Sequence, residues 1–305
     1  MKQKKFFILL MFLISSIVGA SEQHLTREDS LISAAQLKAL INKKTSNLVI
    51  LAVANVIDYR LAHIPGSFQV WRKDYSASES FYQFGGMAAG NDDFTDFARK
   101  LGINQDSIIV LYDHKYDATR LWWQFFVHGK KDVKVLDGGM QAWKAAGFET
   151  QILAPDSPQL GNFTAKRELG LMTVTMDEVH MASEGKSEQY QIWDTREEKE
   201  WSGKELKKGA FRKGRIPKAK FLNWKKFRDM ATGKFKTPGE LKKVIQENGM
   251  DKNKKNIFYC QSGVRTTQEI FALYLLGWPL ENLLNYDGSW IEWSYHNDNK
   301  VVLGK

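Results

Sequence analysis

The residue type best suited to chemistry in this chain is its single cysteine, Cys260. It ends the apolar run Asn256-Ile257-Phe258-Tyr259 and precedes the turn-like sequence Gln261-Ser262-Gly263-Val264-Arg265-Thr266. We expect a strand before the cysteine and a helix after the turn, so the thiol would face a helix N-terminus. The helix dipole, backbone N–H groups and a nearby cation all stabilise a thiolate. Cys260 is therefore a candidate nucleophile.

The residues after Cys260 form a candidate anion cradle, in which a short loop turns its backbone N–H groups toward one sulfur atom. Gly263 lets the backbone turn without a side chain in the way. We expect Arg265 to neutralise an anionic donor and its leaving group. Two alternatives remain, since free cysteines are often inert core residues and Arg265 has Glu269 four residues further along the helix as an ion-pair partner. The cradle comprises Gln261, Ser262, Gly263, Val264, Arg265 and Thr266.

The N-terminus has the pattern of a secretory signal peptide. Lys2, Lys4 and Lys5 precede an apolar stretch, which ends in the small residues Gly19 and Ala20. We therefore expect residues 1–20 to be removed on export, with no stable membrane anchor afterwards, and the mature protein to lie in a bacterial periplasm. In that oxidising compartment a lone thiol cannot form an internal disulfide.

The net charge of the chain is +9, with basic residues scattered and densest between residues 204 and 226. Such residues are commonly solvated, and some can steer small anions toward a site. No nucleic-acid-binding motif accompanies the charge, so we expect no nucleic acid partner. The six histidines lack metal-ligand spacing and there is no glycine-rich nucleotide fingerprint, so neither a metal nor a cofactor is expected.

The chain contains an internal repeat, because matching segments recur in the same order in both halves. Ser33 and Thr175 are candidate N-caps of equivalent helices, and Asp113 takes the position of Cys260. Three further pairs match: the Ile-Pro turns at 63–67 and 215–219, the apolar runs at 106–113 and 256–260, and Asp137-Gly138-Gly139 with Asp287-Gly288-Ser289, each four residues before a tryptophan.

Strands and helices alternate within each half, which predicts an α/β fold with an open, mostly parallel sheet and helices on both faces. Ligands bind such sheets at the carboxyl ends of the strands, where Cys260 stands. We expect domains at residues 21–161 and 162–305, joined by a polar linker at 154–170. The predicted helices include residues 93–100, 120–127, 237–247 and 267–276.

The ordered repeats, with a Cys-x-x-Gly-x-Arg loop only in the second, make the chain similar to the tandem-domain rhodanese family of sulfurtransferases. The resemblance covers nearly all of the mature sequence. It implies two rhodanese-like domains, a catalytically silent first domain, and a second domain that forms a persulfide on Cys260. It also implies a small anionic sulfur donor such as thiosulfate, and cyanide or a thiol as acceptor. We expect a monomer.

Asp194-Thr195-Arg196 resembles the Asp-x-Arg element beside the active site of that family. Asp194 and Arg196, with Arg212 and Arg215, are candidates for substrate binding or for support of the loop. The chain departs from the pattern at Glu200, where many mercaptopyruvate and animal thiosulfate enzymes have an arginine. The missing arginine and the presence of Arg265 favour thiosulfate as donor. A 3-mercaptopyruvate sulfurtransferase and a non-catalytic sulfur carrier remain the alternatives.

Cysteine-dependent phosphatases also place a cysteine and an arginine around an oxyanion, but with five residues between the two. Here four residues intervene, Gln261 to Val264. The tighter ring suits one sulfur atom better than a tetrahedral phosphate, which makes phosphatase chemistry the less favoured interpretation.

Overall fold

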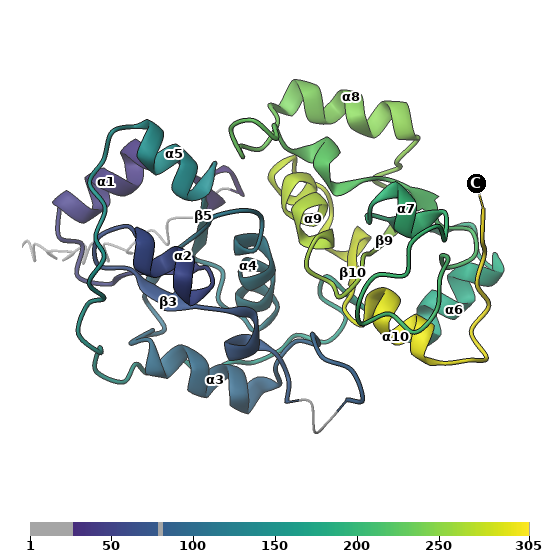
Figure 1. The fold of residues 1–305 in the computed structure, drawn as a ribbon, viewed down its shortest axis with the longest axis horizontal. Coiled ribbons are helices and arrows are strands. Elements are labelled where there is room, and N and C mark those ends of the chain that lie inside the picture. Colours follow the sequence, from purple (N-terminus) through teal and green to yellow (C-terminus); the bar gives the residue numbers. More distant parts are fainter. Residues whose placement is uncertain (1–26, 79–81, 305) are drawn as a thin grey trace, which may run out of the picture.

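The computed structural model describes residues 27–78 and 82–304. The predicted signal peptide lies outside these residues. The described chain forms two α/β domains that lie side by side (Figure 1), each built on a five-stranded parallel sheet. The predicted fold class is therefore confirmed.

The first domain has the strand order β1-β5-β4-β2-β3, with every pair of neighbours parallel. Its strands are β1 (Leu31–Ile32), β2 (Leu48–Val53), β3 (Phe68–Val70), β4 (Ile108–Asp113) and β5 (Val133–Leu136). Its helices are α1 (Ala34–Asn42), α2 (Val56–Leu61), α3 (Asn91–Lys100), α4 (Ala118–Val127) and α5 (Gly139–Ala145), with short 3₁₀ turns at Arg27–Ser30 and Arg72–Tyr75.

The second domain repeats this order as β6-β10-β9-β7-β8, again all parallel. Its strands are β6 (Thr173–Val174), β7 (Tyr190–Asp194), β8 (Lys220–Phe221), β9 (Lys255–Tyr259) and β10 (Leu283–Tyr286). Its helices are α6 (Met176–Glu184), α7 (Glu198–Trp201), α8 (Pro238–Asn248), α9 (Thr266–Leu275) and α10 (Ser289–Tyr295), with 3₁₀ turns at Trp224–Phe227 and Leu280–Asn282.

Each sheet has side chains on both faces, because successive strand residues point to opposite sides, and both faces are buried. In β4, Ile109 and Leu111 join the core shared by the two domains, whereas Val110 and Tyr112 join a core on the outer face of the first domain. Ser33 and Thr175 are confirmed as N-caps, each in a capping box.

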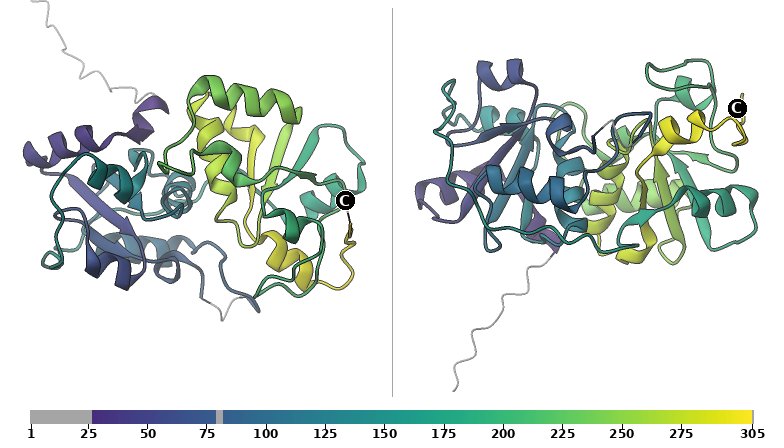
Figure 2. Two further views of the ribbon diagram at one scale, coloured as in Figure 1. Left: turned by 45° about the horizontal axis from the view of Figure 1, so that its top comes forward. Right: turned by 90° about the horizontal axis from the view of Figure 1, so that it is seen from below.

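Helices α4 and α9 pack against each other where the domains meet (Figure 1; the pairing is also visible in Figure 2). The Trp122 ring of α4 lies 4.7 Å from Phe271 and 5.0 Å from Tyr274 of α9, measured between centroids. The Thr119 and Thr267 hydroxyls are hydrogen-bonded at 2.8 Å across the same seam. These helices follow Asp113 and Cys260 respectively, so domain docking acts directly on the two strand-end loops.

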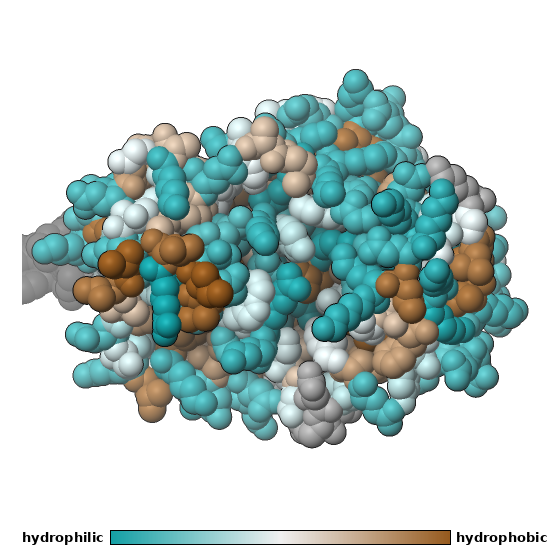
Figure 3. Space-filling view, viewed as in Figure 1, coloured by the Kyte–Doolittle hydropathy of each residue, from teal (hydrophilic) through white to brown (hydrophobic). Residues whose placement is uncertain are grey.

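The linker packs along the first domain. Phe163 is fully buried, and its N–H group donates to Ile103 O. The surface in Figure 3 is mainly hydrophilic, with an apolar patch over α2 formed by exposed Val56, Ile57 and Leu61. Within 27–78 and 82–304, every helix is too short or too polar to cross a bilayer.

Candidate active site

Cys260 lies in the loop between the central strand β9 and helix α9, at the carboxyl end of the second sheet. Only 1% of the residue is exposed. Its backbone is fixed on both sides, since Cys260 N–H donates to Ser289 Oγ (3.1 Å) and Cys260 O accepts from Trp290 N–H (3.0 Å). The expected strand–turn–helix setting is therefore observed.

The loop lowers the pKa of the Cys260 thiol. Burial alone would raise this pKa, but the positive charge of Arg265 and the backbone N–H groups of Thr266, Ser262 and Arg265 outweigh burial. A thiol in this environment is more readily ionised than a free cysteine, and the same donors can hold the anionic outer sulfur of a persulfide. The alternative of an inert core thiol does not account for this ring of donors.

Ser289 anchors the loop through its side-chain hydroxyl. This residue was not identified from the sequence. Its buried hydroxyl accepts from Cys260 N–H (3.1 Å) and Gly263 N–H (3.0 Å), and it donates to Tyr286 O (2.7 Å). Its φ angle is +52°, in the left-handed region that a serine rarely adopts. The Asp287-Gly288-Ser289 motif was the signal that could have found it, because a hydroxyl stands there where the first domain has Gly139.

Glu200 is the ion-pair partner of Arg265. Arg265 Nη1 donates to Glu200 Oε2 at 2.8 Å and Nη2 donates to Oε1 at 2.9 Å, with both side chains almost fully buried. Burial would raise the pKa of Glu200, but the guanidinium of Arg265 lowers it, so the pair is ionised at neutral pH. The glutamate therefore fixes the arginine beside Cys260.

The ion pair bears on two interpretations of Arg265. Its carboxylate partner is Glu200 and not Glu269, because the side chain turns away from its own helix toward α7. Each Nη group gives one of its two N–H bonds to Glu200, and neutralisation of an anionic donor by Arg265 stays a prediction. Arg265 acts on the cysteine as a fixed positive charge.

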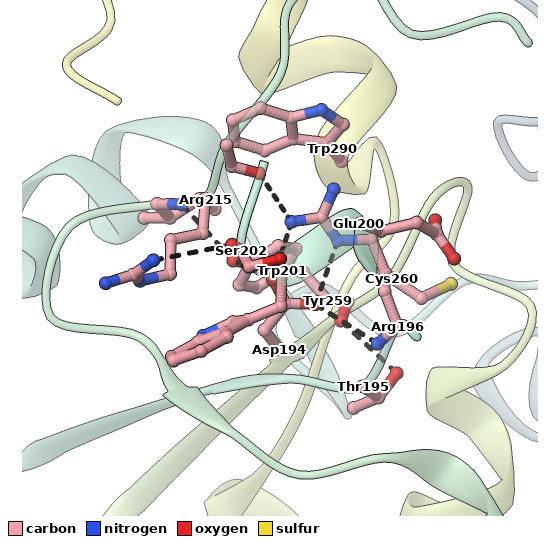
Figure 4. A network of polar contacts seen from close by, with 12 residues as sticks. Asp194, Thr195, Arg196, Glu200, Trp201, Ser202, Arg215, Tyr259, Cys260 and Trp290 are labelled. Carbon is pink, nitrogen blue, oxygen red and sulfur yellow. Dashed lines mark hydrogen bonds and ion pairs between the residues drawn. The ribbon is translucent and has the colours of Figure 1, made fainter. Parts of the chain in front are cut away.

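Asp194 and Arg196 brace the end of β7. Arg196 Nε and Nη2 donate to the two oxygens of Asp194 at 2.9 and 2.6 Å, and Nη2 also donates to Gly214 O at 2.7 Å. Tyr259 Oη donates to Asp194 Oδ2 at 2.7 Å, which ties the pair to the residue before Cys260. In Figure 4 this network lies beside the cysteine, whose sulfur points to the same side as the Glu200 carboxylate. Loop support, one of the two predicted roles, fits this geometry.

Arg212 and Arg215 are committed elsewhere. The guanidinium of Arg212 donates to five carbonyls at and beyond the end of α10, those of Trp293, Ser294, His296, Asn297 and Asn299. Arg215 stacks over Trp201 with 4.2 Å from Cζ to the ring centroid, and it donates to Gly304 O. The structure therefore gives both a role in holding the C-terminal segment, and a substrate-binding role gains no support.

The first domain shows how the same cradle is built without a nucleophile. Asp113 stands where Cys260 stands in the second domain, and its Oδ2 accepts from Ala118 N–H at 2.7 Å. Ala118 is five residues after Asp113, just as Arg265 is five residues after Cys260. A fixed carboxylate thus takes the place of the anionic sulfur.

Within the described parts of the chain, no three histidine, cysteine or acidic side chains are grouped so as to hold a metal ion. The chemistry that the described site offers is that of Cys260, its backbone donors and the Arg265 charge.

The chain thus consists of two parallel α/β domains, and a strand-end loop of the second holds a cysteine in a setting that stabilises an anionic sulfur. The model of the rhodanese-like domain matches residues 33–146 and again 175–296. The chain belongs to the rhodanese family and is a sulfurtransferase.

Known relatives agree with this placement. The chain is 30% identical over 251 residues to the sulfur carrier protein TtuD of Thermus thermophilus, covering 78% of this chain and 85% of that protein. It is also 30% identical over 240 residues to thiosulfate sulfurtransferase of Gallus gallus, covering 77% and 80%. Among solved structures, SseA of Escherichia coli, described as a 3-mercaptopyruvate sulfotransferase, superposes with a TM-score of 0.75 at 26% identity, over 86% of this chain and 98% of that one.

Proposed function

We propose that this protein moves a sulfane sulfur from thiosulfate to cyanide or a thiol acceptor through a persulfide on Cys260. The Cys260 thiolate attacks the outer sulfur of thiosulfate, the S–S bond of the donor breaks, and its electron pair leaves with sulfite. The acceptor then attacks the outer sulfur of the persulfide and restores the thiolate. This two-step transfer predicts ping-pong kinetics.

The observation that carries the proposal is the loop around Cys260. Backbone N–H groups of Ser262, Arg265 and Thr266 and the charge of Arg265 favour an anionic sulfur there. The same groups can stabilise the thiolate before transfer and the persulfide after it, so one cradle serves both half-reactions.

The choice of thiosulfate rests on the arginines around the site. A mercaptopyruvate carboxylate is held best by a bidentate guanidinium, but Arg196 and Arg265 are already paired with Asp194 and Glu200. Lys207 is half exposed, with Nζ 3.7 Å from Glu200. Its ammonium group offers an anionic donor a single positive charge rather than the paired N–H contacts of a guanidinium.

Cys260→Ser tests the mechanism, and we expect a folded protein that forms no thiocyanate. The ratio of kcat/KM for thiosulfate and for 3-mercaptopyruvate tests the donor. A higher value for 3-mercaptopyruvate would overturn the donor assignment while leaving the persulfide in place.

A sulfur carrier is the second candidate, favoured by the carrier name of the Thermus relative. Mass spectrometry after incubation with thiosulfate separates the two. Addition of one sulfur atom to Cys260 without turnover to cyanide or small thiols would establish the carrier function instead.

For location, we propose export to a bacterial periplasm with removal of residues 1–20, on the strength of the leader sequence. The N-terminal sequence of the protein recovered from a periplasmic extract tests this. An N-terminus near Ser21 is expected, and a cytoplasmic protein that begins at Met1 would contradict it.

A further inference from the structure

A buried arginine of the first domain reaches the loop that carries the nucleophile. Arg120 lies in the first turn of α4, with 2% of its side chain exposed. Its Nη1 donates to Gly263 O at 3.1 Å, across the domain seam. Gly263 is the middle of the turn after Cys260, so a residue of the domain without a nucleophile contacts the cradle itself.

The second terminal nitrogen of the same guanidinium, Nη2, contacts two more segments. Arg120 Nη2 donates to Gly86 O at 3.0 Å and forms an ion pair with Asp287 Oδ1 at 2.6 Å. Asp287 Oδ2 in turn accepts from Ala88 N–H at 2.8 Å. The planar guanidinium is therefore the common point of a first-domain loop, the turn after Cys260 and the Asp-Gly-Ser turn that carries the anchor hydroxyl.

Gly263 has little freedom to move between these contacts. Its N–H group donates to Ser289 Oγ and its carbonyl accepts from Arg120, with Asn285 Nδ2 as a weaker second donor at 3.4 Å. In a trans peptide the C=O and the next N–H point in opposite directions, so a carbonyl fixed toward Arg120 turns the Val264 N–H to the other side. The Arg120 contact thus helps to hold the Gly263–Val264 peptide, which lies between the Ser262 and Arg265 N–H groups of the cradle.

We propose that Arg120 is a positioning residue for sulfur transfer, by which the first domain holds the Cys260 loop in its anion-binding conformation. This inference rests on the proposed function for its significance, but its geometry does not require a particular donor. It also gives the silent domain a role, because docking through α4 completes the cradle. A lysine cannot reproduce it, because a single ammonium cannot contact Gly263 O, Gly86 O and Asp287 in one plane.

The test uses three variants and one control. Arg120→Met removes the contact but leaves Asp287 buried without its cation, so the double variant Arg120→Met with Asp287→Asn removes both charges. Arg120→Lys keeps the charge and loses the fork. Gln141→Ala is the matched control, because Gln141 Nε2 donates to Ala231 O across the same seam, away from the loop.

The main readout is the rate of iodoacetamide alkylation as a function of pH. Cys260 is the only cysteine, so the signal comes from one residue, and no sulfur donor is needed. In Arg120→Met and in the double variant we expect the midpoint to move to higher pH and kcat for sulfur transfer to fall about tenfold or more, the loss typical of a charge-assisted hydrogen bond. Arg120→Lys should be intermediate, and Gln141→Ala should match the wild type.

A wild-type alkylation profile in folded Arg120→Met and in the folded double variant would overturn the proposal. If these two variants fail to fold, Arg120→Lys decides, and a wild-type midpoint and kcat in that variant would overturn it as well. An absence of sulfur transfer in the wild-type protein would instead refute the proposed function, while the alkylation profiles would still show whether Arg120 positions the loop.

Discussion

Replacing Ser289 separates the cost of a strained backbone from the value of a loop anchor. Ser289 has φ +52° and 0% exposure, and its hydroxyl accepts from the N–H groups of Cys260 and Gly263. Ser289→Gly removes the hydroxyl and relieves the strain. Ser289→Ala removes the hydroxyl and keeps the strain, since Cβ remains. The two variants lose the same anchor and differ in the backbone.

The expected energies follow from these contacts. Each buried N–H group left without an acceptor costs about 1–3 kcal/mol, so both variants lose stability. The left-handed conformation costs a residue with Cβ roughly 1–2 kcal/mol, and the greater chain entropy of unfolded glycine offsets about 0.4–1 kcal/mol of that difference. We therefore expect Ser289→Gly to be about 1 kcal/mol more stable than Ser289→Ala. Both should lose kcat/KM by about ten- to hundredfold, because the Cys260 and Gly263 amides are no longer held.

Equilibrium unfolding in urea measures the difference in stability between the two variants. Thiocyanate formation from thiosulfate and cyanide measures the loss of kcat/KM in each. Wild-type kcat/KM in Ser289→Gly would show that the hydroxyl does not position the loop. An alanine variant more stable than the glycine variant would refute the assignment of strain to residue 289.

Two further predictions concern ionisation. Arg265→Met should raise the pKa of the Cys260 thiol, because only the backbone N–H groups then remain to offset the effect of burial. The acidic limb of the pH profile of kcat/KM should move to higher pH. An unmoved limb would show that Arg265 is not what lowers this pKa. Glu269 is fully buried, neither carboxyl oxygen has a hydrogen-bond partner in another described residue, and burial raises its pKa well above the usual value. The stability that its neutral form provides is fully present below the unfolded-state pKa and is lost as pH rises through the folded-state pKa. Above about pH 4.5, the unfolding free energy of the wild type should therefore fall relative to that of Glu269→Gln by up to about 1.4 kcal/mol per pH unit. Parallel pH profiles of unfolding free energy for the two proteins would contradict this.

The parts of the site that the sequence predicted are local. A strand followed by Cys-x-x-Gly-x-Arg specifies a strand-end turn within six residues, and the repeat identified Asp113 as its equivalent without a thiol. The fold was predictable for a related reason, since each domain presents its strands and helices in the same order and the capping residues Ser33 and Thr175 mark equivalent helix starts. Periodicity and turn chemistry act over a few residues, so one sequence is enough to recognise them.

The groups that charge and brace the loop come from far along the chain. Glu200 lies 65 residues before Arg265, Ser289 lies 29 residues after Cys260, and Arg120 lies 143 residues before Gly263. No spacing rule connects such positions, because only the packing of β7, β10 and α4 around α9 brings them together. Sequence spacing therefore offered Glu269 as a possible partner for Arg265, whereas the fold pairs the arginine with Glu200.

The repeat gives the two domains different roles at the Cys260 loop. Two copies of one domain each have a strand-end cradle, and the first fills its own with the Asp113 carboxylate, which accepts from Ala118 N–H. Helix α4 follows this filled cradle and presents one face to the second domain. α4 uses that face to contact α9 through Trp122 and Thr119, and the arginine at position 120 extends past the seam to Gly263. The domain that lacks a nucleophile thus contributes, through Arg120, to the support of the Cys260 loop in the other domain.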